Sequence, residues 1–278
     1  MSRFSKASYT KLLNDFISST STFRAISRVP HTSNTELSSA PIKTLYVLDA
    51  SFNPPTRAHS RMALSALKDD AGAAPKSLVI LLSTQNADKA SKPAPLEERL
   101  VMMRLFAEEL KTKLPRDDQD IALHIGLAKA PYFHDKAQAI SEDELFCDAQ
   151  QVYLMGFDTL IRLLDPKYYP PEEKLKVLEP FLDRHRLRVT RRLDDDSGSR
   201  EDQDRYVTAI SHGDRAEDGA DARWGKQIEL VEGRTEAEEA ISSTLARKAA
   251  KANPKNLDRY VLPSVRDYIL SQKLYIEE

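Results

Sequence analysis

The chain has 278 residues, with 41 Lys and Arg against 43 Asp and Glu, and its formal net charge is -2. This near balance gives no overall basicity that would indicate nucleic-acid binding. No apolar run approaches the roughly 18 residues that span a membrane. The single cysteine, Cys147, excludes an internal disulfide framework and a cysteine-rich zinc site, and suits a reducing compartment. The length suits one large domain or one domain with an elaborated edge.

Residues 1–40 are rich in Ser and Thr, and Asp15 is the only acidic residue before Glu36. This composition is typical of a mitochondrial transit peptide. Alternatively, residues 9–17 form an amphipathic helix that docks on the protein and is followed by a Ser/Thr/Pro linker. We favour the docked helix, and expect a cytoplasmic protein. The nucleus as a further compartment, and mitochondrial targeting by residues 1–40, stay open.

From residue 41 onward, short apolar runs alternate with helical patterns, and we take residues 41–278 as one domain. The continuous apolar run Leu78–Leu82 indicates a strand that is buried on both faces of a sheet. The alternation predicts an α/β fold, a doubly wound parallel sheet of about six strands with a C-terminal helical region. The expected strands are 44–48, 77–83, 121–125, 152–155, 187–190 and 227–231. The expected helices are 57–68, 95–113, 135–147, 158–164, 173–184, 199–211, 243–252 and 263–274.

Residues 191–226 are poor in apolar side chains and dense in charge. Three adjacent carboxylates, Asp194 to Asp196, raise the alternative of a metal site. Three consecutive side chains cannot all face one ion from a strand or helix, so we favour a solvated, charged loop insertion.

A polar run follows the first strand of the predicted sheet and leads into a helix. It reads Asp49-Ala50-Ser51-Phe52-Asn53-Pro54-Pro55-Thr56-Arg57-Ala58-His59. The unpaired N–H groups at the start of a helix favour anions, and Thr56 and His59 lie on one face of its first turn. This pattern favours a phosphate site, although an ordinary turn before a helix is the alternative.

The chain contains only eight glycines, and they form neither a GxGxxG pattern nor a GxxxxGK(S/T) loop. A nucleotide would therefore be bound through helix N-termini, hydroxyl groups and cationic side chains.

Two further segments follow predicted strands, where ligands bind in doubly wound sheets. Gly156 allows a close backbone approach after the fourth strand, and Asp158 can accept hydrogen bonds from ribose hydroxyls; a turn with Asp158 as a helix cap is the alternative. The run Ile241-Ser242-Ser243-Thr244-Leu245-Ala246-Arg247 precedes a C-terminal helix. We expect Ser243 to cap that helix and Arg247, one turn later, to bind phosphate in a bidentate manner.

Together the three segments resemble the nucleotidylyltransferase superfamily. The first resembles its (H/T)xxH signature, and Ser-Phe-Asn-Pro-Pro-Thr-x-x-His looks specifically like the nicotinamide mononucleotide adenylyltransferase family. Gly156 to Asp158 resembles the family's GxD segment, and 241–247 its ISSTxxR motif. The resemblance covers most of residues 40–275. It extends to a fungal, promoter-of-filamentation-like branch through five further segments: 86–89, 96–103, 133–136, 157–169 and 224–225.

The resemblance implies a Rossmann-like fold with ATP between the first and last motifs. His59 would stabilise the α-phosphate, with the imidazolium as one option, and Arg247 would take the outer phosphates with Ser243 and Thr244. Magnesium would arrive with ATP and need no protein ligand. Other residues implied in phosphate binding are Ala50, Ser51, Phe52, Thr56 and Lys89; Gly156 and Asp158 would bind near ribose.

Two departures from the family pattern stand out. Ala50 replaces the usual glycine before Ser-Phe, which removes some space at the turn. Many relatives stack nicotinamide on a tryptophan after the third strand, whereas the only tryptophan here is Trp224. We expect Phe133 or Tyr132, or Trp224 folding in from its loop, to provide that surface.

The resemblance implies an enzyme that joins ATP and nicotinamide mononucleotide to give NAD and pyrophosphate, with no nucleic-acid or membrane-spanning role and with protein partners unknown. The absent tryptophan and the charged insertion motivate an alternative, an ATP-binding or slowly ATP-hydrolysing relative with a regulatory role in protein quality control. A third option is another nucleotidylyltransferase, acting on pantetheine phosphate, a flavin precursor or a sugar or polyol phosphate.

Overall fold

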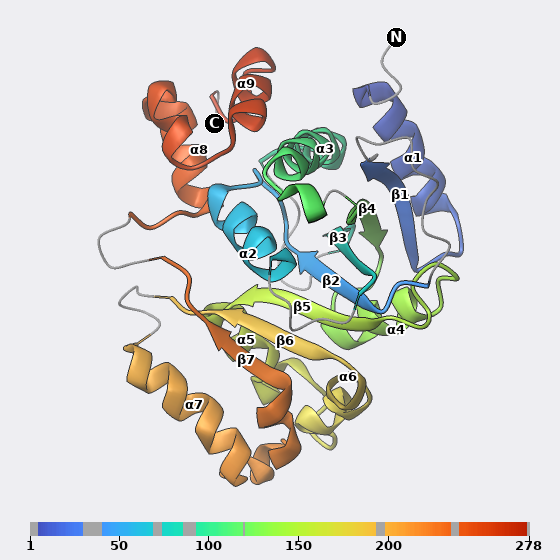
Figure 1. The fold of residues 1–278 in the computed structure, drawn as a ribbon, viewed down its shortest axis with the longest axis vertical. Coiled ribbons are helices and arrows are strands. Elements are labelled where there is room, and N and C mark those ends of the chain that lie inside the picture. Colours follow the sequence, from blue (N-terminus) through green and yellow to red (C-terminus); the bar gives the residue numbers. More distant parts are fainter. Residues whose placement is uncertain are drawn as a thin grey trace.

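The computed structural model describes residues 5–29, 41–68, 74–85, 93–118, 120–192, 198–234 and 239–276. These residues contain one seven-stranded sheet, in the order β1-β4-β3-β2-β5-β6-β7, with helices on both faces (Figure 1). All neighbouring strands are parallel except the edge pair β1 and β4. The strands are β1 Phe23–Val29, β2 Thr44–Asp49, β3 Lys76–Ser83, β4 Ala122–Ala128, β5 Gln150–Gly156, β6 Arg186–Thr190 and β7 Ile228–Val231.

The helices form two layers, one on each face of the sheet. One layer packs over the first core and contains α1 Lys6–Ser18, α2 Arg57–Leu67, α3 Leu96–Thr112, α8 Ser243–Ala252 and α9 Pro263–Ser271. The other covers the second core and contains α4 Phe133–Ser141, α5 Phe157–Leu163, α6 Glu179–Arg184 and α7 Arg200–His212. The predicted doubly wound sheet and C-terminal helices are confirmed (Figure 1).

The apolar central strands explain why the sheet is buried on both sides. Along β3, Leu78, Ile80 and Leu82 belong to the first core, whereas Val79 and Leu81 belong to the second. Because successive strand residues point to opposite faces, a continuous apolar run supplies both cores at once. All six expected strands are present, with shifted ends.

The seventh strand, β1, corrects the expectation that a linker follows the N-terminal helix. Residues 23–29 pair antiparallel with β4, Phe23 opposite Ala128 and Val29 opposite Leu123, with an irregularity between Ala25 and Ser27. An edge strand is exposed along one side, and in β1 only Phe23 and Val29 are buried, so β1 lacks the apolar continuity that identifies the central strands. The expected domain boundary near residue 40 stays a prediction.

The expected docked helix at the N-terminus is confirmed. In α1 the side chains of Tyr9, Leu13 and Phe16 are buried, a spacing that places them on one helix face. The Ser5 hydroxyl accepts a hydrogen bond from the Ser8 N–H and caps the helix start. Lys129 lies 5.2 Å from the centre of the Phe16 ring, so the helix also contacts the end of β4.

The expectation that residues 191–226 form a solvated loop insertion is wrong over their described part, whereas the helix expected at 199–211 is confirmed as α7. Helix α7 begins at a capping box between Ser199 and Asp202 and buries Gln203 and Ile210. Trp224 is only 1% exposed and belongs to the second core. The run Asp194 to Asp196 lies outside the described residues.

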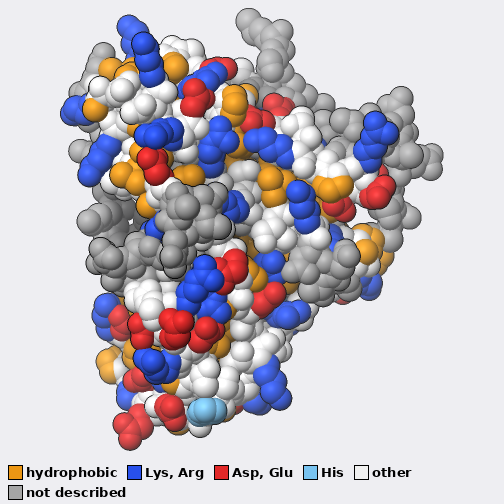
Figure 2. All heavy atoms as spheres, turned by 60° about the vertical axis from the view of Figure 1, so that its left-hand side comes forward, with side chains coloured by type: hydrophobic (Ala, Val, Ile, Leu, Met, Phe, Trp, Pro, Cys, Tyr) orange, Lys and Arg blue, Asp and Glu red, His pale blue; other side chains and the backbone are white. Residues whose placement is uncertain are grey.

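On the face drawn in Figure 2, Lys and Arg side chains are mixed with Asp and Glu rather than gathered by sign. This agrees with the net charge near zero. Across the described ranges, no helix is both long and apolar enough to cross a membrane.

Replacing Phe16 by Ala should lower the free energy of unfolding by about 3 kcal/mol, because a fully buried aromatic ring is lost. Urea denaturation followed by circular dichroism measures this change. The neighbouring Ile17, 51% exposed, is the control, and Ile17→Ala should cost well under about 1 kcal/mol. Equal losses for the two variants would contradict the docked helix.

Candidate nucleotide-binding site

A cavity of about 290 Å³ opens at the carboxyl ends of β2, β5 and β6 and at the starts of α2 and α8. This is the edge at which doubly wound sheets bind ligands. Residues from all three predicted segments line it, among them Ala50, Thr56, His59, Gly156, Asp158 and Ser243. The three motifs, spread over nearly 200 residues of sequence, thus meet at one place.

The turn between β2 and α2 has an unusual backbone. Phe52 is fully buried and has a φ of 46°, a region that residues with a Cβ rarely adopt. The Asn53–Pro54 peptide bond in the same turn is cis. A positive φ at a residue such as Phe52 persists where the surroundings fix it, and such residues cluster at ligand sites.

Side chains from distant helices hold this turn by its carbonyl groups. The Arg247 guanidinium donates to the Asn53 carbonyl at 2.7 Å, and the Ser243 hydroxyl donates to the Pro54 carbonyl at 2.8 Å. With those carbonyls engaged, the start of α8 is fixed against the turn before α2. The predicted meeting of the first and last motifs is therefore present.

The buried side of the same turn is held from α3 and from the C-terminal segment. Arg99 donates to the Ser51 carbonyl at 3.3 Å and to the Ala94 carbonyl at 2.8 Å. The Tyr275 hydroxyl donates to the Asn53 side-chain oxygen at 2.9 Å. Arg99 and Tyr275 were not predicted from the sequence, since neither follows a strand of the sheet.

His59 has a defined hydrogen-bonding state. Its Nδ1 accepts from the backbone N–H of Thr56 at 2.9 Å, so in the neutral ring the proton is on Nε2. Burial lowers the pKa of His59 to about 4. Its ring also packs 5.2 Å from that of Phe52. His59 therefore lines the cavity of the ligand-free protein as a neutral Nε2–H donor, and the imidazolium option for the ATP complex stays a prediction.

The start of α8 differs from the expectation in one detail. Ser242, not Ser243, caps the helix, since its hydroxyl accepts from the Leu245 N–H at 3.2 Å. Ser243 is thereby free to bind the turn before α2. Thr244 is exposed and accepts from the second Arg247 nitrogen at 3.2 Å. The Ser242 cap, the Ser243 hydroxyl and the Arg247 guanidinium therefore still lie together at the start of α8.

Gly156 and Asp158 lie on the opposite wall of the cavity. A Cβ at Gly156 would lie 2.6 Å from the Asp158 carboxylate, so this position needs a glycine to leave the carboxylate in place. Asp158 is half exposed and pairs with Arg192 at 3.0 Å. A carboxylate that faces a cavity and has accessible oxygen can accept from sugar hydroxyls.

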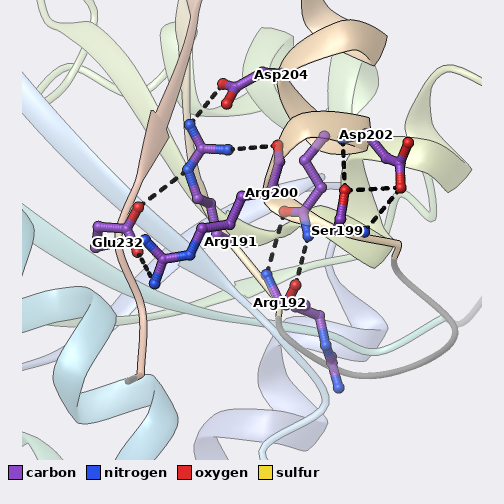
Figure 3. A network of polar contacts seen from close by, with 8 residues as sticks. Arg191, Arg192, Ser199, Arg200, Asp202, Asp204 and Glu232 are labelled. Carbon is purple, nitrogen blue, oxygen red and sulfur yellow. Dashed lines mark hydrogen bonds and ion pairs between the residues drawn. The ribbon is translucent and has the colours of Figure 1, made fainter. Parts of the chain in front are cut away.

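A polar network at the carboxyl ends of β6 and β7 supports this wall (Figure 3). The buried Gln203 amide accepts from the Arg192 N–H and donates to the Arg192 carbonyl, so α7 fixes the backbone of that arginine. Arg191 pairs with Asp204 at 2.6 Å and with Glu232 at 3.3 Å. Helix α7, within the predicted insertion, thus supports the wall of the site. This role was not predicted because the segment is rich in charged residues.

An aromatic cluster stands at the start of α4, on the second face of the sheet. The Tyr132 and His134 rings are stacked at 5.7 Å, and each lies 6.0 Å from Tyr169. Phe133, a predicted stacking residue, is half-buried and packs edge-on against Tyr153 at 5.6 Å. His134 and Tyr169 were missed because isolated aromatic residues in a sequence usually indicate packing.

Of the remaining expected residues, Ser51 is exposed in the turn. Trp224 is only 1% exposed in the second core, so its ring offers no face for stacking. Like Trp224, the aromatic cluster at the start of α4 lies outside the cavity lining. Lys89 lies outside the described residues. Among the residues that the structure describes, no group of three or more His, Cys, Asp or Glu side chains could hold a metal ion.

The family model described as cytidylyltransferase-like matches residues 47–249. The chain belongs to this family. It is also 34% identical over 255 residues to a Schizosaccharomyces pombe protein named "Putative nicotinamide mononucleotide adenylyltransferase", covering 92% of this chain and 91% of that protein. The family resemblance predicted from the motifs is therefore confirmed, and with it membership in a nucleotidyltransferase family.

Solved structures with the same fold include Plasmodium falciparum nicotinic acid mononucleotide adenylyltransferase. Its complex with NaAD matches with a TM-score of 0.52 and 17% identity, over 84% of this chain and 97% of that one. Its complex with APC matches with a TM-score of 0.51 and 18% identity over the same shares. At this identity the match supports the fold alone.

The tautomer of His59 gives a direct prediction. Nitrogen-15 NMR of the ligand-free protein should show a neutral ring with the proton on Nε2 from pH 8 down to about pH 5.5, because the pKa is near 4. Titration of His59 with a midpoint between pH 6 and 7 would contradict the burial and the hydrogen bond described above.

Proposed function

We propose that this protein transfers the adenylyl group of ATP to nicotinamide mononucleotide, giving NAD and pyrophosphate. The observation that carries the proposal is the meeting of α2 and α8 at the turn 50–56, because two helix starts offer N–H groups to one triphosphate. The similarity to the S. pombe protein supports the same reaction.

The chemistry asks for positioning and charge neutralisation rather than a general base. The 5′-phosphate of the mononucleotide is already anionic near neutral pH, and one of its oxygens attacks the α-phosphorus of ATP. The bond from that phosphorus to the oxygen bridging to the β-phosphorus breaks, and pyrophosphate leaves with its magnesium. Magnesium enters as part of the substrate, bound to the phosphate oxygens.

We assign the roles of the side chains accordingly. His59 donates from Nε2 to the α-phosphate, and its neutral form costs no charge burial before ATP binds. Arg247 binds the β- and γ-phosphates with Ser243 and Thr244, while Asp158 binds ribose hydroxyls. Smaller contacts come from Ala50, Ser51, Phe52, Thr56 and Gly156, and Lys89 would add a cation.

We assign the aromatic cluster at the start of α4, which lies outside the cavity lining and is linked to it through α4, to the flat, cationic ring of the second substrate. Tyr132, His134 and Tyr169 offer π faces, and aromatic faces attract a pyridinium. Phe133 stays a candidate for the same surface. In this proposal, these residues provide the stacking surface that many relatives take from a tryptophan.

Purified protein with ATP, magnesium and nicotinamide mononucleotide should produce NAD, measured with an NAD-dependent dehydrogenase. His59→Ala and Arg247→Ala should each lower kcat about 100-fold or more, since each removes a donor to phosphate. Lys248→Ala, an exposed change on the same helix as Arg247, is the control and should leave kcat unchanged.

Other outcomes separate the alternatives. Tight ATP binding without any transfer, with or without slow ATP hydrolysis, would support the regulatory relative in protein quality control. Pyrophosphate release with pantetheine phosphate, a flavin precursor or a sugar or polyol phosphate, but not with nicotinamide mononucleotide, would support another nucleotidylyltransferase. Either outcome would contradict the proposed reaction.

A further inference from the structure

The carboxyl end of β2 carries a buried ion pair to which the proposed transfer step assigns no role. Lys136 Nζ lies 2.6 Å from the Asp49 carboxylate, and the two side chains are 6% and 7% exposed. Burying two charges costs more desolvation energy than an isolated pair usually returns. The stability of the core therefore does not explain why this ion pair lies next to the phosphate turn.

The two partners are not equivalent with respect to the cavity. Asp49 lines it, whereas Lys136 lies behind, 5.3 Å from the centre of the Phe133 ring. Lys136 is the one side-chain partner of Asp49 among the described residues, and it contacts Oδ2. The other carboxylate oxygen, Oδ1, belongs to a side chain that lines the cavity. The site therefore presents the negative end of the pair.

Asp49 also lies beside the aromatic residues proposed to hold the second substrate. Its neighbours two and four positions earlier, Val47 and Leu45, belong to the second core, so alternation along β2 directs Asp49 toward α4. Burial raises the pKa of Tyr153, and the Asp49 carboxylate contributes to this rise. Tyr153 in turn packs against Phe133. Asp49 thus adjoins the phosphate turn and contacts α4, the helix at whose start the aromatic cluster lies.

We propose that Asp49, backed by Lys136, makes this site select a mononucleotide with a neutral carboxamide over one with a carboxylate on the ring. Both substrates carry the ring cation, so the carboxylate attracts both. The acid form adds a negative charge that a buried carboxylate repels, whereas the amide offers an N–H donor to Oδ1. This inference rests on the proposed function and adds its substrate preference.

The test compares kcat/KM for nicotinamide mononucleotide with kcat/KM for nicotinic acid mononucleotide. Each variant is measured with both substrates on one preparation, so the ratio is independent of the fraction that folds. The wild type should favour the amide. Asp49→Asn should lower the amide-to-acid ratio about tenfold, the order expected for one like-charge contact. The double variant Asp49→Asn with Lys136→Met, which leaves no unpaired charge, should lower it as well.

Glu229→Gln is the matched control, since it removes the carboxylate of an ion pair with Arg188 that does not line the cavity. Its ratio should equal that of the wild type. A wild type that favours the acid, or a ratio unchanged within about twofold in both Asp49 variants while dinucleotide still forms, would overturn the inference alone. No product from either substrate would instead overturn the proposed function, and the preference with it.

Discussion

The whole site depends on hydrogen bonds between distant side chains and the carbonyl groups of one turn. Arg247 and Ser243 bind the carbonyls of Asn53 and Pro54, and Arg99 binds that of Ser51. A guanidinium that donates to a carbonyl keeps its charge, so the turn is fixed without a carboxylate that would repel phosphate. The strained backbone at Phe52 is thereby held, and α8 cannot move away from α2.

The groups that line the cavity differ in charge between its two ends. Around the helix starts, N–H groups, a neutral imidazole and a guanidinium suit the triphosphate. Farther along the strand ends, the carboxylates Asp158 and Asp49 line the cavity, and each lies beside a cation, Arg192 and Lys136 respectively. These two carboxylates are thus paired with opposite charges, which agrees with a net charge of the chain near zero.

Much of this arrangement could be predicted from the sequence. The apolar runs specified six strands because central parallel strands are buried on both faces, and the three motifs specified the cavity because strand ends share one edge. Edge strand β1 was missed, since its polar residues and Ser/Thr-rich flanks indicate a linker. Asp49–Lys136 and Gln203–Arg192 could not be predicted either, because pairs far apart in sequence have no local pattern. Trp224 was misjudged because charged neighbours concealed its burial.

A crystal structure with a non-hydrolysable ATP analogue would test the central claim most directly. We expect the α-phosphate within hydrogen-bonding distance of His59 Nε2, and the outer phosphates between the start of α8 and the Arg247 guanidinium. A triphosphate bound elsewhere, or one that touches His59 while Arg247 stays on the Asn53 carbonyl with no phosphate contact, would contradict the idea that two helix starts grip a single nucleotide.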